Sequence, residues 1–402
     1  MASIHILTLE ARRSGGAATY SEELVRQLAS RGHRVSLICH EAEPELEKVS
    51  ETYRLPPSKA DQLPWAWRLA VLLRQRDYNR AIRALPLDRP DFVIGSAQQM
   101  IPEHQRRFPG VPLVYVPHSL VAPFEVQTMP WPSLLQRWVS AGVFHYLELR
   151  ALNQARSTIR FTRAGCEALT AYYGKSIKPR FVVLPTPVPI PNLPGDFDGM
   201  NSKRHPHLRL LYVGRLVESK NVAWLLRCLN RLDHLSWTCD IVGDGEERPH
   251  LEKLTLQRGL ENRIVFHGHQ DDVASFYRQA DLLVFPSRLE NSPLVLLEAM
   301  SFGVPTLSIR ADGQRYINAN HEIITAGHDG FLAEGEEQFV QKLQELLISP
   351  DCLKTVGRNA RQTVEKRHRW VDHIGGYERI FEEITGTSGR SSRNEETQPC
   401  LR

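Results

Sequence analysis

Two glutamates, Glu290 and Glu298, stand with seven residues between them in the stretch ENSPLVLLEAM. Glu290 comes just before a predicted helix whose first turn holds Pro293, and proline favours such early positions. Glu298 lies inside that helix among apolar side chains, where a carboxylate is costly unless it accepts hydrogen bonds. Ribose hydroxyls would be suitable donors. The alternative interpretation is an acid near a helix N-terminus together with an internal salt bridge.

Two cations follow the end of a predicted strand in the stretch VGRLVESKN. Arg215 comes directly after Gly214, and Lys220 stands five residues later at the start of a helix. Arginine offers a planar fork of donors and lysine a point charge, so the two could hold a diphosphate without a metal ion. The alternative is a pair of ordinary surface cations.

Glycines follow several predicted strands. Gly15 and Gly16 lie between the first strand and the first helix, where small residues let a phosphate approach the amides of a helix N-terminus. The stretch does not match GxGxxG, so a dinucleotide fingerprint is absent. Gly243, Gly245 and Gly268 repeat the strand–glycine–helix arrangement. Each alone indicates only a turn, but at successive strand ends they would line one crevice with amides suited to a nucleobase.

Short β-rich runs alternate with helical stretches through both halves of the chain. Strands are predicted at residues 5–9, 34–39, 92–94, 113–116, 158–161 and 181–184, and again at 209–213, 238–242, 264–267, 282–285 and 306–309. Helices in the second half are predicted at residues 222–232, 247–258, 293–302, 336–348, 353–367 and 370–384. Such alternation indicates βαβ units and mainly parallel sheets. We therefore predict an α/β protein with two Rossmann-like, doubly wound parallel-sheet domains that face a cleft.

A stretch dense in Pro, Gly and Asn interrupts this alternation at residues 185–207. We predict an N-terminal domain over residues 1–189, a linker over 190–207 and a C-terminal domain over 208–369. Residues 386–402 have almost no apolar content, so we expect a disordered tail there.

The composition is that of an ordinary globular protein of 402 residues, 42% hydrophobic and 24% charged, which excludes collagen-like, coiled-coil and wholly disordered chains. No run approaches the roughly 18 apolar residues of a membrane span, and the N-terminus is typical of a strand, not of a signal peptide. The six cysteines are scattered without a CxxC pair, so neither a disulfide framework nor a zinc site is indicated. A cytoplasmic location is the simplest expectation.

These features together resemble a known family. The Glu290–Glu298 spacing, followed by Gly303-Val304-Pro305, is similar to the EX7E signature of the retaining glycosyltransferases of family 4, which have the GT-B fold. The resemblance extends through SGGAATYSEEL, PHS, VGRLVESKN, IVGDGEER and DLLVFPS, and it covers residues 3–384. It implies an enzyme that moves a sugar from a nucleotide-diphosphate sugar to a hydroxyl acceptor in glycan, glycolipid or glycoside biosynthesis.

The resemblance also implies a role for each matching residue. The catalytic roles are those of His118 beside the reacting carbon, Glu290 on the donor sugar, and Arg215 and Lys220 on the leaving diphosphate. The donor-binding residues would be Gly15, Gly16, Gly243, Gly245, His267, Gly268, Asn291, Ser292, Pro293, Leu294 and Glu298, with Glu298 on the ribose. The N-terminal domain would bind the acceptor and the C-terminal domain the donor, and the helix at 370–384 would pack back on the N-terminal domain.

We expect no metal and no cofactor, since a UDP- or GDP-sugar is the substrate itself. Asp271 and Asp272 suggest helix capping and not a metal site, because acids suit the N-terminal end of a helix dipole.

Retention in the family is usually described as front-face attack, in which the leaving phosphate helps to deprotonate the acceptor. The stretch after Pro305 matches the family only loosely, so no site is assigned there. The rival interpretations are a GT-B sugar-nucleotide epimerase and a non-catalytic GT-B scaffold.

Charge is distributed unevenly along the chain. Residues 1–195 hold 24 Lys/Arg against 16 Asp/Glu, whereas residues 196–402 hold 26 against 30. Residues 54–83 contain seven of these cations and two tryptophans, as a helix on an anionic membrane would, although the basic and apolar faces do not separate cleanly. A core helix beside the acceptor is the alternative. We expect at most weak contact with anionic membranes, at the inner membrane face, and no nucleic-acid partner. The acceptor, whether a saccharide, a lipid-linked glycan or a small molecule, stays open.

Overall fold

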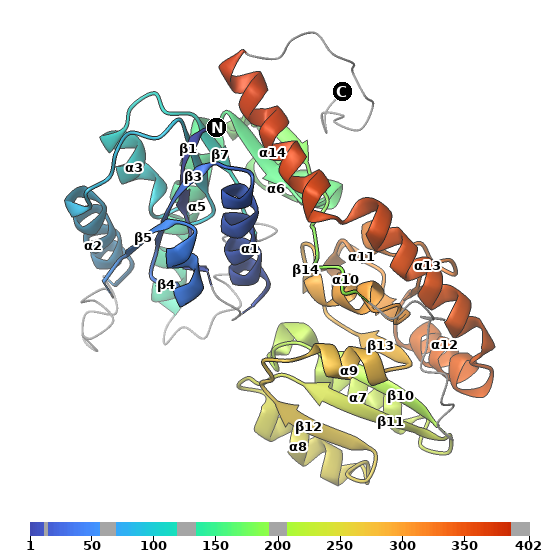
Figure 1. Cartoon of the computed structure of the whole chain (residues 1–402). Helices are drawn as coiled ribbons and strands as arrows, with labels where there is room; N and C mark the ends of the chain where they lie inside the picture. Colours follow the sequence, from blue (N-terminus) through green and yellow to red (C-terminus); the bar gives the residue numbers. More distant parts are fainter. Residues whose placement is uncertain (12–14, 57–69, 119–133, 193–206, 387–402) are drawn as a thin grey trace. The chain divides into compact units, whose positions relative to one another are not determined.

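The chain divides into two compact units (Figure 1). The computed structural model describes residues 1–11, 15–56, 70–118, 134–192 and 207–386. Unit 1 joins Met1–Leu184 to His373–Arg402, and unit 2 is Pro185–Asp372. Unit 1 is therefore assembled from two segments that lie far apart in the sequence. Most of the predicted linker, and the predicted tail beyond Gly386, lie outside the described residues.

A seven-stranded sheet runs through the described part of unit 1. Its strands, in spatial order, are β5 (Glu51–Arg54), β3 (Arg34–Cys39), β1 (Ser3–Leu7), β6 (Phe92–Gly95), β7 (Leu113–Tyr115), β8 (Ser157–Arg160) and β9 (Phe181–Val183). All neighbouring strands are parallel. The chain adds strands outward from β1 on one side and then from β6 on the other, so the strand order reverses between β1 and β6.

Helices connect these parallel strands, as βαβ units require. They are α1 (Gly16–Ser30), α2 (Ala70–Ala84), α3 (Ile101–Arg107), α5 (Leu134–Gln154) and α6 (Arg163–Tyr173), joined by α14 (Trp370–Thr385) from the second segment. Smaller elements are β2 (Glu10–Ala11), β4 (Glu41–Ala42), and the short 3-10 helices η1 (Pro44–Lys48) and η4 (Gly174–Ser176). None of the described helices is both long and apolar enough to cross a membrane.

Unit 2 repeats this architecture with a six-stranded sheet among its described residues. The spatial order is β12 (Ile264–Gly268), β11 (Trp237–Val242), β10 (Leu208–Val213), β13 (Leu282–Phe285), β15 (Thr306–Ile309) and β17 (Phe331–Ala333), with all neighbours parallel. A separate two-residue pair is formed by β14 (Leu289–Glu290) and β16 (Ile317–Asn318). Here the strand order reverses between β10 and β13.

The helices of unit 2 follow the same alternation. They are α7 (Val222–Asn230), α8 (Arg248–Gln257), α9 (Ala274–Gln279), α10 (Leu294–Ser301), α11 (Asn320–Ile323), α12 (Glu336–Ile348) and α13 (Asp351–Arg367), with the short 3-10 helix η5 (Glu218–Lys220) after β10. The α/β class with two parallel sheets, predicted from the alternation, is confirmed.

The β10 strand shows why its sequence folds in this way. Leu210 and Tyr212 belong to the core on one face of the sheet, whereas Leu211 and Val213 belong to the core on the other. All four are buried, because helices cover both faces of a parallel sheet and its strands read as continuous apolar runs.

A pair of histidines lies in the core of unit 1. His5 on β1 and His104 on α3 are buried, and His5 Nδ1 lies 2.8 Å from His104 Nε2. Burial, assisted by nearby Arg107, lowers the pKa of His5 to about 4. Burial likewise lowers the pKa of His104 to about 3. The folded state therefore requires both rings to be neutral.

We predict that this pair makes unit 1 sensitive to acid. A histidine whose pKa is lowered on folding contributes stability above about pH 6.5, and that contribution is lost as the pH falls toward 4. Each such histidine steepens the loss by up to roughly 1.4 kcal/mol per pH unit. Urea unfolding at pH 7.5, 6 and 5 should show a shallower pH dependence for His104→Gln than for the wild type. Identical slopes would contradict the prediction.

Candidate active site

The reversal of strand order in unit 2 marks the place where a ligand would bind. The loops that leave β10 and β13 diverge at this point, and ligands of doubly wound sheets sit in the crevice outside such carboxyl ends. The loop after β10 carries Arg215 and leads into η5, and the loop after β13 leads through β14 to Glu290. The segments after these two strands therefore carry the four most chemically distinctive residues of this unit. Arg215 lies in the loop after β10 and Lys220 in η5, whereas Glu290 lies in β14 and Glu298 in α10.

Backbone hydrogen bonds connect the loops after β10, β11 and β12. The Gly214 amide donates to Val242 O at 3.0 Å, the Gly243 amide to Gly268 O at 2.8 Å, and the Leu216 amide to Asp244 O at 2.8 Å. The three loops thus form one rigid edge of the site.

Two glycines are required for this close approach. A Cβ added at Gly243 would lie 2.0 Å from Gly214 O, and one at Gly245 would lie 2.3 Å from Leu216 O. The sequence predicted amides here that are open to a nucleobase. That prediction is wrong at both positions, because the Gly243 amide bonds Gly268 O and the Gly245 amide bonds Asp244 Oδ1 at 2.8 Å. The glycines shape the edge and do not offer these amides to a ligand.

Lys220 and Glu290 form an ion pair that the spacing alone did not indicate. Lys220 Nζ lies 2.5 Å from Glu290 Oε1, and both side chains are mostly buried, with 17% and 11% of their surface exposed. The η5 segment is held against the β14 loop, because the Arg288 amide donates to Ser219 O and Asn221 Nδ2 donates to Pro286 O. Asn221 adopts the left-handed conformation, with φ 62°, at the turn into α7.

Arg215 differs from Lys220 in its surroundings. Its side chain is exposed, and its guanidinium has no carboxylate partner among the residues that the structure describes. Its carbonyl accepts a hydrogen bond from the Tyr212 hydroxyl at 3.2 Å, which holds the loop close to the end of β10. The site therefore combines one cation paired to a carboxylate with a second cation open to an anion.

Glu298 accepts a hydrogen bond from a tyrosine and forms no salt bridge with any residue that the structure describes. The Tyr277 hydroxyl on α9 donates to Glu298 Oε2 at 2.8 Å, and the Tyr277 ring stacks on Phe302. Burial raises the pKa of Glu298, and the Tyr277 hydrogen bond opposes that rise by favouring the charged form. Nothing in the sequence pattern marks Tyr277, because its partner is 21 positions away on another helix.

The N-terminus of α10 stands between the two glutamates. Pro293 precedes the first helical residue, Leu294, in an extended conformation with φ −72° and ψ 111°. Asn291 is buried, and Ser292 Oγ lies 2.6 Å from Thr186 Oγ1. The segment before α10 is therefore held in place by the burial of Asn291 and the hydrogen bond of Ser292.

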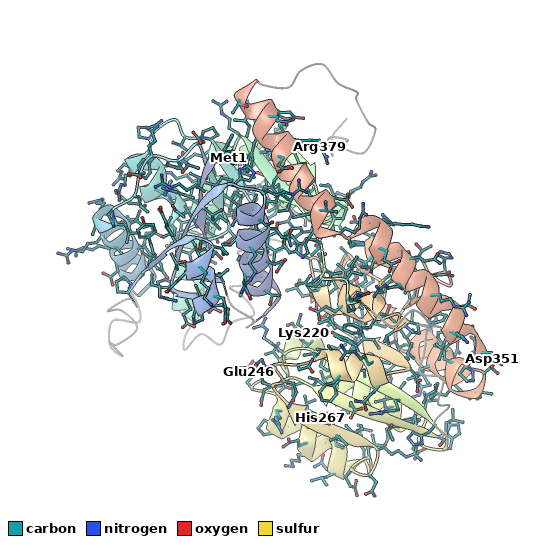
Figure 2. All side chains as sticks on the ribbon, viewed as in Figure 1. Met1, Lys220, Glu246, His267, Asp351 and Arg379 are labelled. Atoms are coloured by element: carbon teal, nitrogen blue, oxygen red, sulfur yellow. The ribbon has the colours of Figure 1, made fainter. Side chains whose placement is uncertain are left out.

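His267 lies beside an acid on the neighbouring strand. Its Nε2 lies 2.6 Å from Asp240 Oδ1 on the neighbouring strand, and its ring packs against Phe276. Asp240 also pairs with Arg209 at 3.4 Å. The His267 side chain thus belongs to a polar network of the sheet that also includes Asp240 and Arg209. Figure 2 labels it, together with Lys220, in unit 2.

The remaining predicted residues, which are Gly15, Gly16 and His118, lie in unit 1. Gly16 begins α1, and a Cβ added at Gly15 would meet no described atom within 4 Å. His118 follows β7, and burial, assisted by Arg160, lowers the pKa of His118 to about 4. The His118 ring is therefore neutral at neutral pH.

Candidate metal ligands do not gather anywhere in the described chain: no group of three or more His, Cys, Asp or Glu residues there could hold a metal ion. The Asp272 carboxylate accepts the Ala274 amide at 3.0 Å at the start of α9, in keeping with the capping interpretation.

We predict that Gly243→Ala destabilises unit 2 more than Gly259→Ala does. Both glycines are left-handed, with φ 133° and 67°, but only Gly243 has a backbone oxygen in the way of a Cβ. The left-handed backbone alone should cost Gly259→Ala about 1–2 kcal/mol. The clash should add about 1–3 kcal/mol for Gly243→Ala. Chemical unfolding of the two variants measures the difference, and equal losses would contradict the role given to Gly243.

Two family models match the sequence of this chain. Residues 14–190 match the family model described as Glycosyltransferase Family 4, and residues 199–363 match the one described as Glycosyl transferases group 1. The N-acetyl-alpha-D-glucosaminyl L-malate synthase of Bacillus anthracis is 33% identical over 146 residues, which is 36% of this chain and 37% of that protein. An alpha-1,4-N-acetyl-D-galactosaminyltransferase of Campylobacter jejuni is 30% identical over 158 residues, or 38% of this chain and 42% of that protein. The matched regions thus span less than half the length of these curated relatives.

Solved structures share the fold over nearly the whole chain. Sucrose-phosphate synthase from Thermosynechococcus elongatus superposes with a TM-score of 0.76 at 18% identity, covering 96% of this chain and 100% of that one. WaaG, a glycosyltransferase involved in lipopolysaccharide biosynthesis, gives a TM-score of 0.70 at 21% identity, covering 95% and 100%. The chain therefore belongs to the glycosyltransferases of family 4 and group 1, and its fold is GT-B.

Proposed function

We propose that this protein is a retaining glycosyltransferase that moves a sugar from a nucleotide-diphosphate sugar to a hydroxyl acceptor. The observation that carries the proposal is the cluster of Arg215, Lys220 and Glu290 at the strand-order reversal of unit 2, with Glu298 on the adjacent helix. Two cations at that position match the charge of a diphosphate, and two carboxylates match the hydroxyls of sugars.

Related structures support a nucleotide-sugar donor. The Anabaena protein HepE, which superposes with a TM-score of 0.66, was solved in complex with UDP-glucose. At 18% identity this likeness concerns the fold, so the base and the sugar bound by the present protein are part of the proposal. We propose a UDP- or GDP-sugar.

The leaving diphosphate gives Arg215 and Lys220 their role. Negative charge grows on the β-phosphate as the glycosidic bond breaks, and preorganised cations stabilise it without having to reorganise. Lys220 is already held by Glu290, so an arriving diphosphate competes with this carboxylate for the ammonium group. Once Lys220 turns to the phosphate, Glu290 is released to accept hydrogen bonds from the donor sugar.

Glu298 is proposed to hold the ribose. The Tyr277 hydrogen bond orients one carboxylate oxygen and partly offsets the burial that raises the pKa of Glu298. A charged acceptor binds hydroxyl donors more strongly than a neutral one does.

His118, neutral because of its burial, is proposed to contact the donor sugar beside the reacting carbon. By resemblance, the mechanism is front-face attack in which the leaving phosphate takes the acceptor proton. Neither Glu290 nor Glu298 is then needed as a nucleophile. A retaining hydrolase, by contrast, places two carboxyl groups about 5–5.5 Å apart to form a covalent intermediate.

The acceptor is proposed to be a saccharide, a lipid-linked glycan or a small molecule. The Campylobacter jejuni relative acts, by its name, on a glycan linked to undecaprenyl diphosphate. A lipid-linked acceptor would suit contact between the basic N-terminal segment and an anionic membrane.

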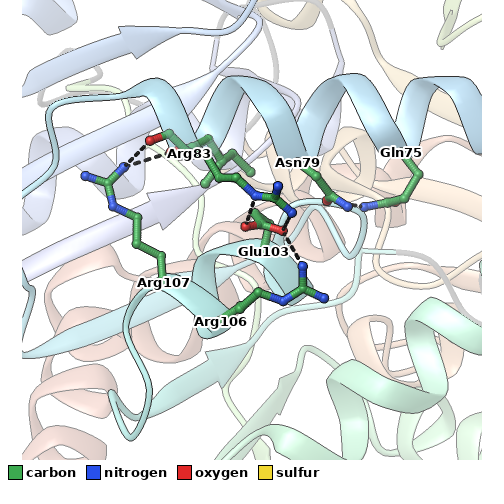
Figure 3. Close-up of polar contacts among 7 residues, drawn as sticks. Gln75, Asn79, Arg83, Glu103, Arg106 and Arg107 are labelled. Carbon is green, nitrogen blue, oxygen red and sulfur yellow. Dashed lines mark hydrogen bonds and ion pairs between the residues drawn. The ribbon is translucent and has the colours of Figure 1, made fainter.

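The described part of that basic segment weakens the electrostatic argument for membrane contact. Figure 3 shows Arg83 of α2 joined to Glu103 of α3, with Nε and Nη2 at 2.6 and 3.0 Å from the carboxylate oxygens. Arg106 pairs with the same carboxylate at 3.2 Å. Arg76 and Arg80 are exposed on α2. Because Arg83 stabilises a buried acid between two helices, we propose that membrane contact is weak at most.

We predict that Glu298→Ala and Glu290→Gln have different effects. Loss of charged hydrogen bonds to the ribose costs roughly 1.5–3 kcal/mol each, so Glu298→Ala should weaken UDP or GDP binding about 10- to 150-fold. Glu290→Gln should lower kcat without weakening nucleotide binding, because Lys220 loses the carboxylate that competes with the diphosphate. Calorimetric titration with UDP and GDP, with the exposed Glu337→Ala as control, measures the affinities. Wild-type affinity in Glu298→Ala would exclude the ribose role.

We also predict that transfer does not need a divalent metal, because Arg215 and Lys220 supply the positive charge at the diphosphate. Activity with the donor that the wild type accepts should persist after dialysis against EDTA. Loss of activity in EDTA, followed by recovery on adding manganese, would show that a metal neutralises the leaving group instead.

A further inference from the structure

Aromatic rings from three distant parts of unit 1 surround His118. The Tyr20 ring on α1 lies 5.2 Å from the His118 ring at 69°, and the Phe161 ring lies 5.7 Å from it at 31°. Beyond them stand two residues of α14, His373 and Tyr377, with ring centroids 5.5 Å apart. The residue proposed to contact the donor sugar therefore borders a cluster that includes the C-terminal helix.

Two hydrogen bonds hold the Tyr20 side chain. Its hydroxyl lies 2.7 Å from His373 Nε2 and 2.9 Å from the Tyr377 hydroxyl. Burial raises the pKa of Tyr20 well above its usual value, so the hydroxyl keeps its proton. With one proton, Tyr20 donates one of these bonds and accepts the other. Both partners lie on α14, so this helix sets the direction of the Tyr20 ring.

The backbone next to His118 is held from a different side. Arg160 on β8 is completely buried, and its Nη1 donates to Pro117 O at 3.0 Å. The main chain at the end of β7 is thus tied to the neighbouring strand. The His118 ring itself packs against Tyr20 and Phe161.

The α14 residues are well placed to act as a support. A Cβ added at Gly376 would lie 2.6 Å from Leu184 Cδ2, which shows how closely the helix approaches the end of the first segment. One turn further on, Phe381 stacks on Phe92 of β6 with centroids 4.3 Å apart. Glu378 pairs with Arg31 at 3.4 Å. From His373 onward, α14 is therefore an integral part of unit 1.

We infer that Tyr20, His373 and Tyr377 are positioning residues that orient His118 for the transfer reaction. The inference rests on the proposed function of His118 and adds that the C-terminal helix contributes to catalysis through the Tyr20 hydroxyl. If the cluster served packing alone, removing hydroxyl bonds would lower stability and leave turnover unchanged.

The test compares tyrosines that each lose buried hydrogen bonds in the same unit. Tyr20→Phe removes both bonds of the cluster but keeps the ring, and Tyr377→Phe removes one. The matched control is Tyr173→Phe, since Tyr173 is buried and its hydroxyl donates to Glu148 at 2.7 Å, outside the cluster. His373→Gln, which can still bond Tyr20, is compared with His373→Leu, which cannot. This second pair keeps the test decisive if Tyr20→Phe fails to fold.

Two readouts separate orientation from stability. The Cε1–Hε1 resonance of His118, in protein labelled at histidine with carbon-13 and assigned with His118→Gln, reports the ring directly. Turnover is measured as hydrolysis, with water as the hydroxyl acceptor, of whichever of UDP-glucose, UDP-N-acetylglucosamine and GDP-mannose the wild type cleaves. We expect Tyr20→Phe to move the His118 resonance and lower kcat about tenfold or more, since a misplacement of 1 Å can cost roughly 100-fold. Donor KM should change less than about twofold, and His373→Gln should restore most of what His373→Leu loses.

Two results would overturn the inference: an unmoved His118 resonance in Tyr20→Phe, or equal losses of kcat in Tyr20→Phe and Tyr173→Phe. If the wild type cleaves no nucleotide sugar, the proposed function fails. The His118 resonance then still decides whether the hydroxyl cluster orients the ring.

Discussion

Parallel strands bring their carboxyl ends to one edge of a sheet, and the candidate site of this protein depends on that constraint. In unit 2 the edge is made rigid by hydrogen bonds between successive loops, and two of its glycines stand where a Cβ would strike a neighbouring carbonyl. The same edge positions η5 and β14, which bring Lys220 to Glu290 from opposite sides of the strand-order reversal. The chemistry of the site is thus a consequence of the loop packing beneath it.

The Lys220–Glu290 pair lets the two charges at the site compensate each other. An unpaired charge in such a partly buried place would be costly, so each side chain compensates the other until a ligand arrives. In the proposed reaction, Lys220 binds the diphosphate and Glu290 binds the donor sugar, and these two contacts replace the ion pair. An ion pair of this kind favours a ligand that satisfies both charges over one that satisfies only one.

The sequence predicted the sheets well because buried parallel strands are short apolar runs with turns between them, as in β10. It also indicated the edge residues Arg215 and Glu298, because strand ends and helix interiors have local signatures. The partners of the site residues could not be predicted. Lys220 and Glu290 are 70 positions apart, and Tyr20 and His373 are 353 apart, so only tertiary packing brings each pair together. The two-residue strands β14 and β16 are likewise too short to show the repeating pattern of apolar residues by which a strand is predicted.

The discontinuity of unit 1 has a consequence for synthesis on the ribosome. The last strand of its sheet ends at Val183, but the helix that covers Tyr20 and Phe92 begins at Trp370. At about 5–20 residues per second, translation of the intervening chain takes on the order of ten to forty seconds. During that interval the nascent unit exposes an apolar surface that its own later segment will cover. The surface is thus exposed in the growing chain and covered in the finished protein.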